Sequence, residues 1–221
     1  MLTVHHLNNS RSQRVLWLLE ELGLPYEIVR YQRQPDMRAP AELRATHPLG
    51  KSPVITDNGN TIAESGAITE YLIETYGDGR LIPQPKTPER LRYTYWLHYA
   101  EGSAMPPLLL KLLFTLMPKR APALLRPIVR KVANQALTTL VNPQLKQHMA
   151  FWEAELGKSE WFAGSAFSAA DIQMSFPLEA GAARGGLDQG HPRAMAFLER
   201  IHARPAYQRA LEKGGPYTVG R

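Results

Sequence analysis

The chain has 221 residues, of which 44% are hydrophobic and 21% are charged, and it contains 18 prolines, 16 glycines and no cysteine. This length suits one large domain or two small ones, and the composition is typical of a globular protein rather than a disordered one. Without cysteine the chain forms no disulfide, no thiolate metal site and no cysteine nucleophile. Any sulfur chemistry must therefore be brought in by a ligand.

The apolar segments argue against a membrane or exported protein. The first residues lack a basic region followed by an apolar one, as a signal peptide would have. The longest apolar run, Met105–Met117, is interrupted by Pro106, Pro107 and Lys111, and it is shorter than the roughly 20 residues that cross a bilayer. We therefore expect a soluble, cytoplasmic chain.

The formal net charge of +6 is concentrated in one stretch. Residues 101–150 carry seven lysines and arginines against the single acidic residue Glu101. A basic stripe of this kind is often a solvated helix face, although it can also meet an anionic lipid surface or an acidic partner. For Met105–Leu140, which is both basic and apolar, we favour a homodimer interface or a substrate pocket over contact with a membrane surface. Aromatic residues do not interleave with the basic positions, so we expect no nucleic-acid partner.

The first third of the chain predicts alternating strands and helices. The predicted elements are, in order, a strand over Leu2–Leu7, a polar turn over Asn8–Ser12, a helix from Arg14 to Leu22, a strand over Tyr26–Tyr31, a short helix over Ala41–Ala45, strands over Pro53–Thr56 and Thr61–Ala63, and a helix over Gly66–Tyr76. Gly23 and Pro25 end the first helix, and Asp57–Asn60 is a strong hairpin turn. The β-α-β-α-β-β-α order predicts a small mixed α/β sheet with helices on both faces.

The rest of the chain predicts helices alone. The helical segments are Glu89–Met117, Ala123–Gly157, Ser168–Gly181, Pro192–Ala203 and Pro205–Lys213. We expect a domain over residues 1–80, a linker over 81–88 and an all-α domain over 89–221. Ser168–Asp171 is similar to a helix capping box, so Asp171 is expected to be structural.

The turn that follows the first predicted strand is a candidate anion site. The start of a helix exposes unpaired backbone N–H groups and a positive dipole end, which can hold a phosphate, a carboxylate or a thiolate. Asn9, Ser10 and Ser12 supply short polar side chains there. The alternative is that Ser10 or Ser12 only caps the helix.

Two further segments favour a ligand with an amino-acid head group. Pro53 stands at the start of a predicted strand, so Ser52–Pro53 is a candidate cis bond that exposes the backbone of Ser52. Glu64 and Ser65 fall between a strand and a helix, where Glu64 would pair with an ammonium group and Ser65 would receive a carboxylate.

Four segments, in this order and spacing, resemble the thioredoxin-like half of cytosolic glutathione transferases. They are Asn9–Arg14, Gly23–Glu27, His47–Pro53 and Glu64–Ile68. The helical remainder is similar to the second domain of that family, so the resemblance covers nearly the whole chain. Five shorter segments narrow the resemblance: Val4–Leu7, Asn9–Arg11, Trp17–Leu19, Arg38–Pro40 and His47–Gly50. With them the chain looks most like the yeast-type transferase 1 subgroup and its bacterial relatives.

The resemblance implies glutathione as co-substrate, with a specific set of contacts. The backbone of Ser52, before a cis Pro53, would pair with the cysteinyl part of glutathione. Glu64 and Ser65 would hold the γ-glutamyl amino and carboxylate groups, and Lys51 would reach the glycyl carboxylate. No metal is implied.

The resemblance also implies that Ser10 points its hydroxyl at the glutathione sulfur. Alignment on Arg14 and Gly23 instead puts Asn9 where zeta-type enzymes have their first serine, so Ser10, Asn9 and Ser12 all stay candidates for the catalytic group. Lowering a thiol pKa from about 8.5 by about two units takes about 2.7 kcal/mol. One hydroxyl hydrogen bond and a helix N-terminus can supply that amount.

The function that this resemblance implies is a homodimeric detoxification transferase. It would activate the glutathione thiol as a thiolate for attack on a hydrophobic electrophile or a peroxide, with glutathione-dependent peroxidase or disulfide reductase as possible side activities. The second domain would supply the electrophile pocket, with Tyr99, Ser103 or Met105 as lining candidates. The alternative is a non-catalytic glutathione-binding or ligand-binding protein on the same fold.

Overall fold

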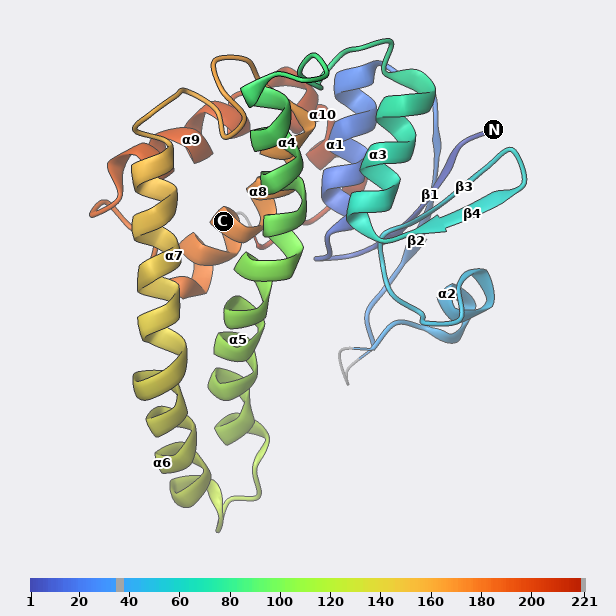
Figure 1. The fold of residues 1–221 in the computed structure, drawn as a ribbon. Coiled ribbons are helices and arrows are strands. Elements are labelled where there is room, and N and C mark those ends of the chain that lie inside the picture. The colour runs from blue at the N-terminus through green and yellow to red at the C-terminus, as the bar shows by residue number, and fades with distance from the viewer. Residues whose placement is uncertain (35–37, 220–221) are drawn as a thin grey trace.

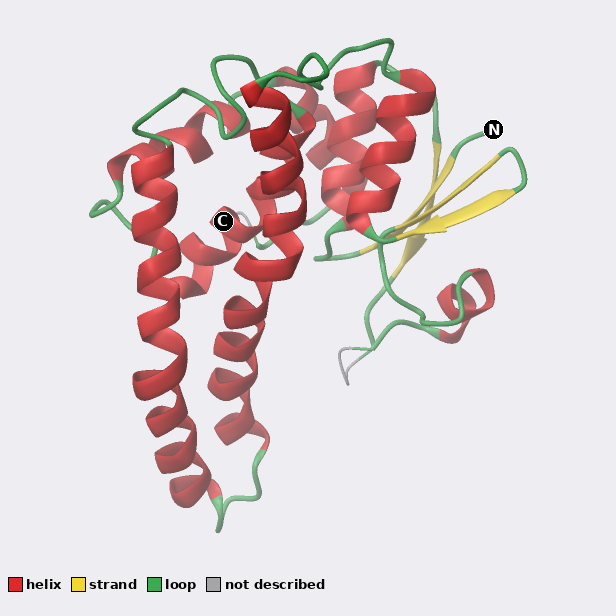
Figure 2. Cartoon of the chain, viewed as in Figure 1, coloured by secondary structure: helices red, strands yellow, loops and turns green. Residues whose placement is uncertain are grey.

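Four strands form the sheet of the first third of the chain, which is called the sheet half below (Figures 1 and 2). The computed structural model describes residues 1–34 and 38–219. In these ranges the sheet half contains β1 (Thr3–Leu7), α1 (Ser12–Leu22), β2 (Glu27–Tyr31), α2 (Ala41–Thr46), β3 (Val54–Asp57), β4 (Asn60–Ala63) and α3 (Ser65–Tyr76). This order confirms the predicted β-α-β-α-β-β-α arrangement.

The sheet is mixed, as the sequence predicts, with strand order β2-β1-β3-β4. The central strand β1 pairs in parallel with β2 and antiparallel with β3, which places Val4 opposite both Ile28 and Ile55. The β3–β4 hairpin turns through Asn58 and Gly59, which both have positive φ, as a two-residue hairpin turn requires. Helices α1 and α3 lie side by side against this sheet (Figure 1).

The rest of the chain, called the helical half below, is helical in the residues that the structure describes. It contains α4 (Pro88–Tyr99), the π-helical segment η1 (Ala100–Ala104), α5 (Met105–Arg120), α6 (Arg126–Ala136), the π-helical segment η2 (Leu137–Val141), α7 (Asn142–Glu155), α8 (Ala169–Ala180), the π-helical segment η3 (Gly181–Gly185), α9 (Pro192–His202) and α10 (Pro205–Gly214). Helices α5 and α6 form a long hairpin that extends away from the rest of the molecule (Figure 1). The domain boundaries at residues 80 and 89 stay a prediction.

The π-helical segment η1 was not expected from the sequence, and consecutive prolines explain it. Pro106 and Pro107 have no N–H, so the carbonyls of Gly102 and Ser103 lose their ordinary α-helical partners. Glu101 lies within η1 and pairs with Arg11 and Arg14 of the sheet half.

The two halves share one hydrophobic core, with Trp17 of α1 at the junction. Trp17 is 1% exposed, and its ring lies 5.1 Å from that of Tyr207 and 5.7 Å from that of Phe167. Asp171 fixes the start of α8 by accepting from the backbone N–H groups of Phe162 and Ser168, at 2.8 and 2.9 Å. The structural role expected for Asp171 is thereby confirmed.

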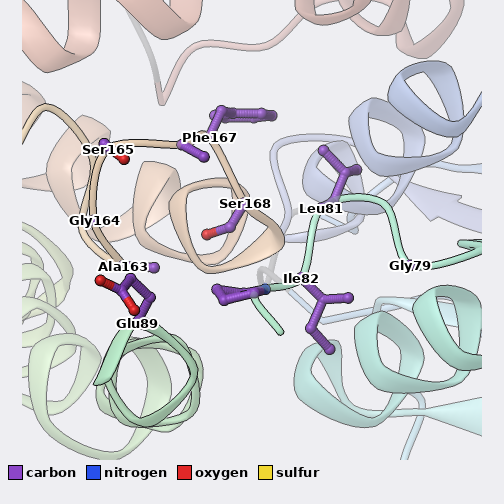
Figure 3. A pocket seen from close by; sticks show the side chains of 11 residues that line it. Gly79, Leu81, Ile82, Glu89, Ala163, Gly164, Ser165, Phe167 and Ser168 are labelled. Carbon is purple, nitrogen blue, oxygen red and sulfur yellow. The ribbon is translucent and has the colours of Figure 1, made fainter. Parts of the chain in front are cut away.

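A cavity of about 280 Å³ lies where the segment between α3 and α4 meets the loop before α8 (Figure 3). Leu81, Ile82 and Phe167 line it, and Glu89 stands at its edge. The backbone N–H of Ala169 donates to the carbonyl of Leu81 at 2.8 Å, which links the connecting segment to the start of α8 beside this cavity.

No helix within residues 1–34 and 38–219 is long and apolar enough to cross a membrane. In the same ranges, no group of three or more histidine, aspartate or glutamate side chains is arranged to hold a metal ion.

Candidate functional site

A second cleft, of about 350 Å³, lies at the end of the sheet where the two halves face each other. Its lining includes all five residues predicted to bind glutathione: Lys51, Ser52, Pro53, Glu64 and Ser65. The helical half contributes Glu101 from η1 and Leu109 from α5. The cleft therefore joins a polar wall from the sheet half to a partly apolar wall from the helical half.

The segment before β3 forms the floor of the cleft. The peptide bond between Ser52 and Pro53 is cis, as the sequence predicts. Pro53 is buried, and the Ser52 hydroxyl donates to the carbonyl of His5 on the central strand at 3.3 Å. These contacts fix the backbone of Ser52 at the edge of the sheet.

Glu64 and Ser65 bring the start of α3 to the same cleft. Glu64 has φ 73° and ψ 128°, a backbone conformation that residues other than glycine rarely adopt and that costs about 1–3 kcal/mol. Ser65 is 4% exposed and is the first residue of the helix. The unpaired N–H groups and the positive dipole end of α3 make this position suitable for a carboxylate.

Arg14, which the sequence analysis did not single out, links this wall to the helical half. It is 3% exposed, and its Nη2 donates to the Ser65 hydroxyl at 3.0 Å and also to Glu101. Its Nη1 donates to the backbone carbonyl of Gln173 at 2.6 Å. That carbonyl is available because Pro177, four residues later in α8, has no N–H to donate. The sequence signal for this contact is Pro177, a proline inside a predicted helix, because it leaves one backbone carbonyl without its helical partner.

Glu101 is the carboxylate at the centre of this network. Its Oε2 lies 3.0 Å from Nε of Arg11, and its other oxygen accepts from Arg14. Burial raises the pKa of Glu101, but the charges of Arg14 and Arg11 outweigh this effect and hold the pKa below its ordinary value. Arg11 also packs against the ring of Phe176, with its guanidinium carbon 5.4 Å from the ring centre. Glu101 therefore stays ionised and orders both arginines.

The three candidates for the catalytic group lie just behind the cleft wall. Ser10 and Ser12 are buried, and their hydroxyl oxygens are 2.7 Å apart. The Ser10 hydroxyl is also 3.2 Å from that of Ser52, which lines the cleft. Asn9 is turned toward the C-terminal segment, where its Oδ1 accepts from the N–H and the hydroxyl of Thr218 at 2.8 and 3.0 Å. Arg11 is the residue of this turn that lines the cleft.

On the helical side, the residues that line the cleft differ from those predicted from the sequence. Tyr99 and Met105 are buried in the core, at 7% and 5% exposure, and Nε1 of Trp152 donates to the Tyr99 hydroxyl at 3.1 Å. None of Tyr99, Ser103 and Met105 lines the cleft; the helical half contributes Glu101 and Leu109, and Leu109 is 49% exposed.

A thioredoxin-like sheet domain whose cleft is closed by an all-helical domain is the arrangement that the sequence resemblance implied. The family model for the glutathione S-transferase N-terminal domain matches residues 1–74, and that for the glutathione S-transferase C-terminal domain matches residues 116–205. Glutathione S-transferase 3 of Schizosaccharomyces pombe is 37% identical over 214 residues, covering 96% of this chain and 88% of that protein. The chain belongs to the glutathione S-transferase family.

Other relatives agree with this assignment. Glutathione S-transferase 1 of Saccharomyces cerevisiae is 32% identical, covering 96% of this chain and 95% of that protein. A solved glutathione S-transferase from Actinobacillus pleuropneumoniae is 32% identical with a TM-score of 0.79, covering 100% of this chain and 96% of that chain. A sphingomonad glutathione S-transferase solved in complex with glutathione is 25% identical with a TM-score of 0.73, covering 96% of this chain and 98% of that chain. The resemblance to yeast-type and bacterial transferases is confirmed.

Proposed function

We propose that the cleft at the end of the sheet binds glutathione and presents its thiol, as a thiolate, to an electrophile held against the helical half. Conjugation of glutathione to electrophiles is the activity of the family to which the chain belongs. The observation that carries the proposal is the convergence of Lys51, Ser52, Glu64 and Ser65 on one cleft from two separate segments.

The charges of the cleft fit the two ends of the tripeptide. Glu64 offers a carboxylate to the γ-glutamyl ammonium, and Ser65 with the start of α3 offers donors to the adjacent carboxylate. Lys51 is exposed and lines the same cleft, where it would pair with the glycyl carboxylate. The backbone of the adjacent Ser52 would pair with the cysteinyl peptide, and the sulfur would then point toward the turn Asn9–Ser12, since the Ser52 hydroxyl lies 3.2 Å from that of Ser10.

The electrophile would lie on the other side of that sulfur. Leu109 supplies an apolar surface there, and Arg11 supplies a positive charge. An apolar wall with a few polar groups is typical of small-molecule sites. A peroxide could be reduced at the same place, so peroxidase and disulfide reductase side activities stay predictions of this arrangement.

A twofold dimer would cover the exposed apolar face of the α5–α6 hairpin. Leu113, Ile128 and Val132 are 53%, 65% and 59% exposed there. Because no acidic residue occurs between Glu101 and Glu153, two such hairpins would repel each other face to face. Exposed Glu70 and Glu74 on α3 offer a complementary surface on a second copy. A cytoplasmic location stays a prediction.

Calorimetry and ultraviolet spectroscopy together test the proposed function. Glutathione should bind, and the bound thiol should show a thiolate absorbance band at neutral pH. An activated aryl chloride should then be conjugated at a rate that saturates with glutathione. Binding without a thiolate band or turnover would favour the non-catalytic alternative, and the absence of binding at millimolar glutathione would contradict both.

Sedimentation velocity of the wild type and of Ile128→Glu tests the dimer, because the variant should be monomeric.

A further inference from the structure

Two arginines of the sheet half meet the carboxylate of Glu101, but they use their guanidinium groups differently. Arg14 is 3% exposed, and both of its terminal nitrogens donate to protein acceptors. Arg11 lines the cleft with a side chain that is 33% exposed, and Glu101 meets it at the buried inner nitrogen, 3.0 Å from Nε. Among the residues that the structure describes, neither Nη atom of Arg11 has a hydrogen-bond partner. The outer edge of Arg11, formed by these two nitrogens, is therefore open to a ligand.

The protein holds Arg11 in this position before any ligand arrives. Its guanidinium carbon lies 5.4 Å from the ring centre of Phe176 on α8, where the cation is attracted to the aromatic face. Its backbone is fixed at the start of α1, because its carbonyl accepts from the N–H of Arg14 at 3.1 Å. A planar guanidinium binds a carboxylate through two parallel hydrogen bonds, and one that is already ordered loses little side-chain entropy when it does so.

The position of Arg11 decides which ligand this edge meets. Arg11 follows Ser10 in the turn toward which the glutathione sulfur would point, whereas the proposed glutathione contacts come from other segments. Leu109 of the helical half lines the same cleft and is 49% exposed. A molecule placed beside the sulfur on this side therefore meets an apolar surface and the outer edge of one guanidinium group.

The charge of this wall favours an anion. Glu101 offsets one of the two guanidinium groups that it meets, so Arg11, Arg14 and Glu101 together carry a net charge of 2 − 1 = +1. Glu64, the other carboxylate that lines the cleft, is the proposed partner of the glutathione ammonium group. A carboxylate beside the outer edge of Arg11 is therefore attracted to this wall.

We propose that Arg11 is a specificity-determining residue for the second substrate, and that this substrate is an apolar electrophile that bears a carboxylate. Arg11 binds the carboxylate through Nη1 and Nη2 while the electrophilic carbon faces the sulfur. A neutral electrophile of the same shape gains no such bonds, so Arg11 separates the two by their difference in binding. This inference rests on the proposed function, because it concerns the molecule that the glutathione thiolate attacks.

A pair of aryl chlorides that differ in charge tests this inference. One is para-chloro-dinitrobenzoate, with both nitro groups beside the chlorine, and the other is the corresponding neutral benzamide. In both, the thiol proton leaves to solvent, the sulfur forms a bond to the carbon that carries chlorine, and chloride leaves with the electron pair of the broken bond. The measured quantity is the ratio of kcat/KM for the acid to kcat/KM for the amide, at saturating glutathione. Both react with the same thiolate, so a change in the thiol pKa cancels in this ratio.

Two cations of the cleft should behave differently in this measurement. Arg11→Gln removes the charged edge and should lower the acid-to-amide ratio about tenfold, as expected for the loss of a hydrogen bond to a charged group. Arg11→Lys keeps the charge but not the planar group, so its ratio should lie between these values. Lys51→Gln is the matched control: it should weaken glutathione binding in calorimetry and leave the ratio unchanged.

Glutathione affinity separates this role of Arg11 from a direct contact with glutathione. In Arg11→Gln the dissociation constant for glutathione should stay within about threefold of the wild-type value. A rise of about tenfold or more would mean that Arg11 holds glutathione, and it would overturn the inference. An acid-to-amide ratio that is the same in Arg11→Gln and the wild type would also overturn it, while turnover of both substrates would leave the proposed function intact. A wild type that binds no glutathione would contradict the proposed function itself.

The wild type alone gives a second measurement, which decides the matter if Arg11→Gln does not fold. Dinitrobenzoate without the chlorine cannot react, and it should inhibit conjugation at least about fivefold more strongly than dinitrobenzamide does. Added salt should reduce this difference, because the ion pair forms at a partly exposed site. Equal inhibition by the two compounds would overturn the inference.

Discussion

The guanidinium of Arg14 donates to the backbone carbonyl of Gln173 across 159 positions of sequence, at 2.6 Å. The bond exists because Pro177 leaves that carbonyl without its helical partner. The same guanidinium reaches the Ser65 hydroxyl, which lines the glutathione cleft. One side chain thereby connects the proposed γ-glutamyl subsite to the packing of the helical half.

Replacement of Arg14 by methionine should be strongly destabilising. It leaves Glu101 with only Arg11 and removes the donor to the buried carbonyl of Gln173. Removing one partner of a buried ion pair costs about 3–5 kcal/mol, and urea unfolding should show a loss near the lower figure because Glu101 is partly exposed. Arg209→Met is a matched control, since Arg209 pairs with Glu20 but is 49% exposed, and it should cost less than about 1 kcal/mol. Equal losses in the two variants would contradict this account.

The local features of the fold were predictable because each depends on neighbouring residues. The helix that ends at Gly23 and the hairpin turn at Asn58 and Gly59 both require positive φ, which these residue types allow. The cis bond at Pro53 and the placement of Ser65 at a helix start follow in the same way. These short-range signals were enough to bring the binding candidates to one cleft.

The remaining features depend on contacts between distant segments. The bond from Thr218 to Asn9 joins residues 209 positions apart, and it turns Asn9 toward the C-terminal segment. The role of Glu101 arises from its ion pairs with two arginines of the sheet half, which lie about 90 positions earlier in the sequence. No spacing rule within one element gives such contacts, so the sequence did not predict them.

Glu64 holds a strained backbone at the binding cleft, and glycine should relieve the strain. The conformation costs about 1–3 kcal/mol for a side-chain-bearing residue, while glycine brings an entropic cost of about 0.5–1 kcal/mol. Glu64→Gly should therefore raise the free energy of unfolding by about 1 kcal/mol and weaken glutathione binding, because the carboxylate is lost. Glu64→Gln keeps the strain and separates the two effects. A Glu64→Gly protein that is both less stable and equally tight in binding would refute the prediction.

His6 should make the protein sensitive to mild acid. Its folded pKa of about 4 lies below the ordinary 6.5, so the unfolded chain binds a proton more readily between these values. The contribution of neutral His6 is therefore complete above about pH 6.5 and is lost as the pH falls toward 4, by about 3 kcal/mol in total. The measurement is the difference in unfolding free energy between the wild type and His6→Asn across this range. His98→Asn provides the comparison for an exposed histidine. A difference that stays constant from pH 7 to about 4 would count against a neutral, buried His6.

Ser65→Ala should separate binding from chemistry. The variant loses one hydroxyl donor to the γ-glutamyl carboxylate, and hydrogen bonds to charged groups are worth about 1.5–3 kcal/mol. The Michaelis constant for glutathione should therefore rise about tenfold or more, while kcat at saturating glutathione should change little because the sulfur is on the central cysteinyl residue, away from the γ-glutamyl carboxylate. Stability should fall by only about 1 kcal/mol, since Arg14 keeps its bonds to Glu101 and Gln173. Thr69→Ala is the control: the Thr69 hydroxyl donates to the carbonyl of Ser65 at 2.8 Å, one turn along the same helix, and its loss should leave the Michaelis constant unchanged. An unchanged Michaelis constant in Ser65→Ala would mean that the glutamyl head binds elsewhere.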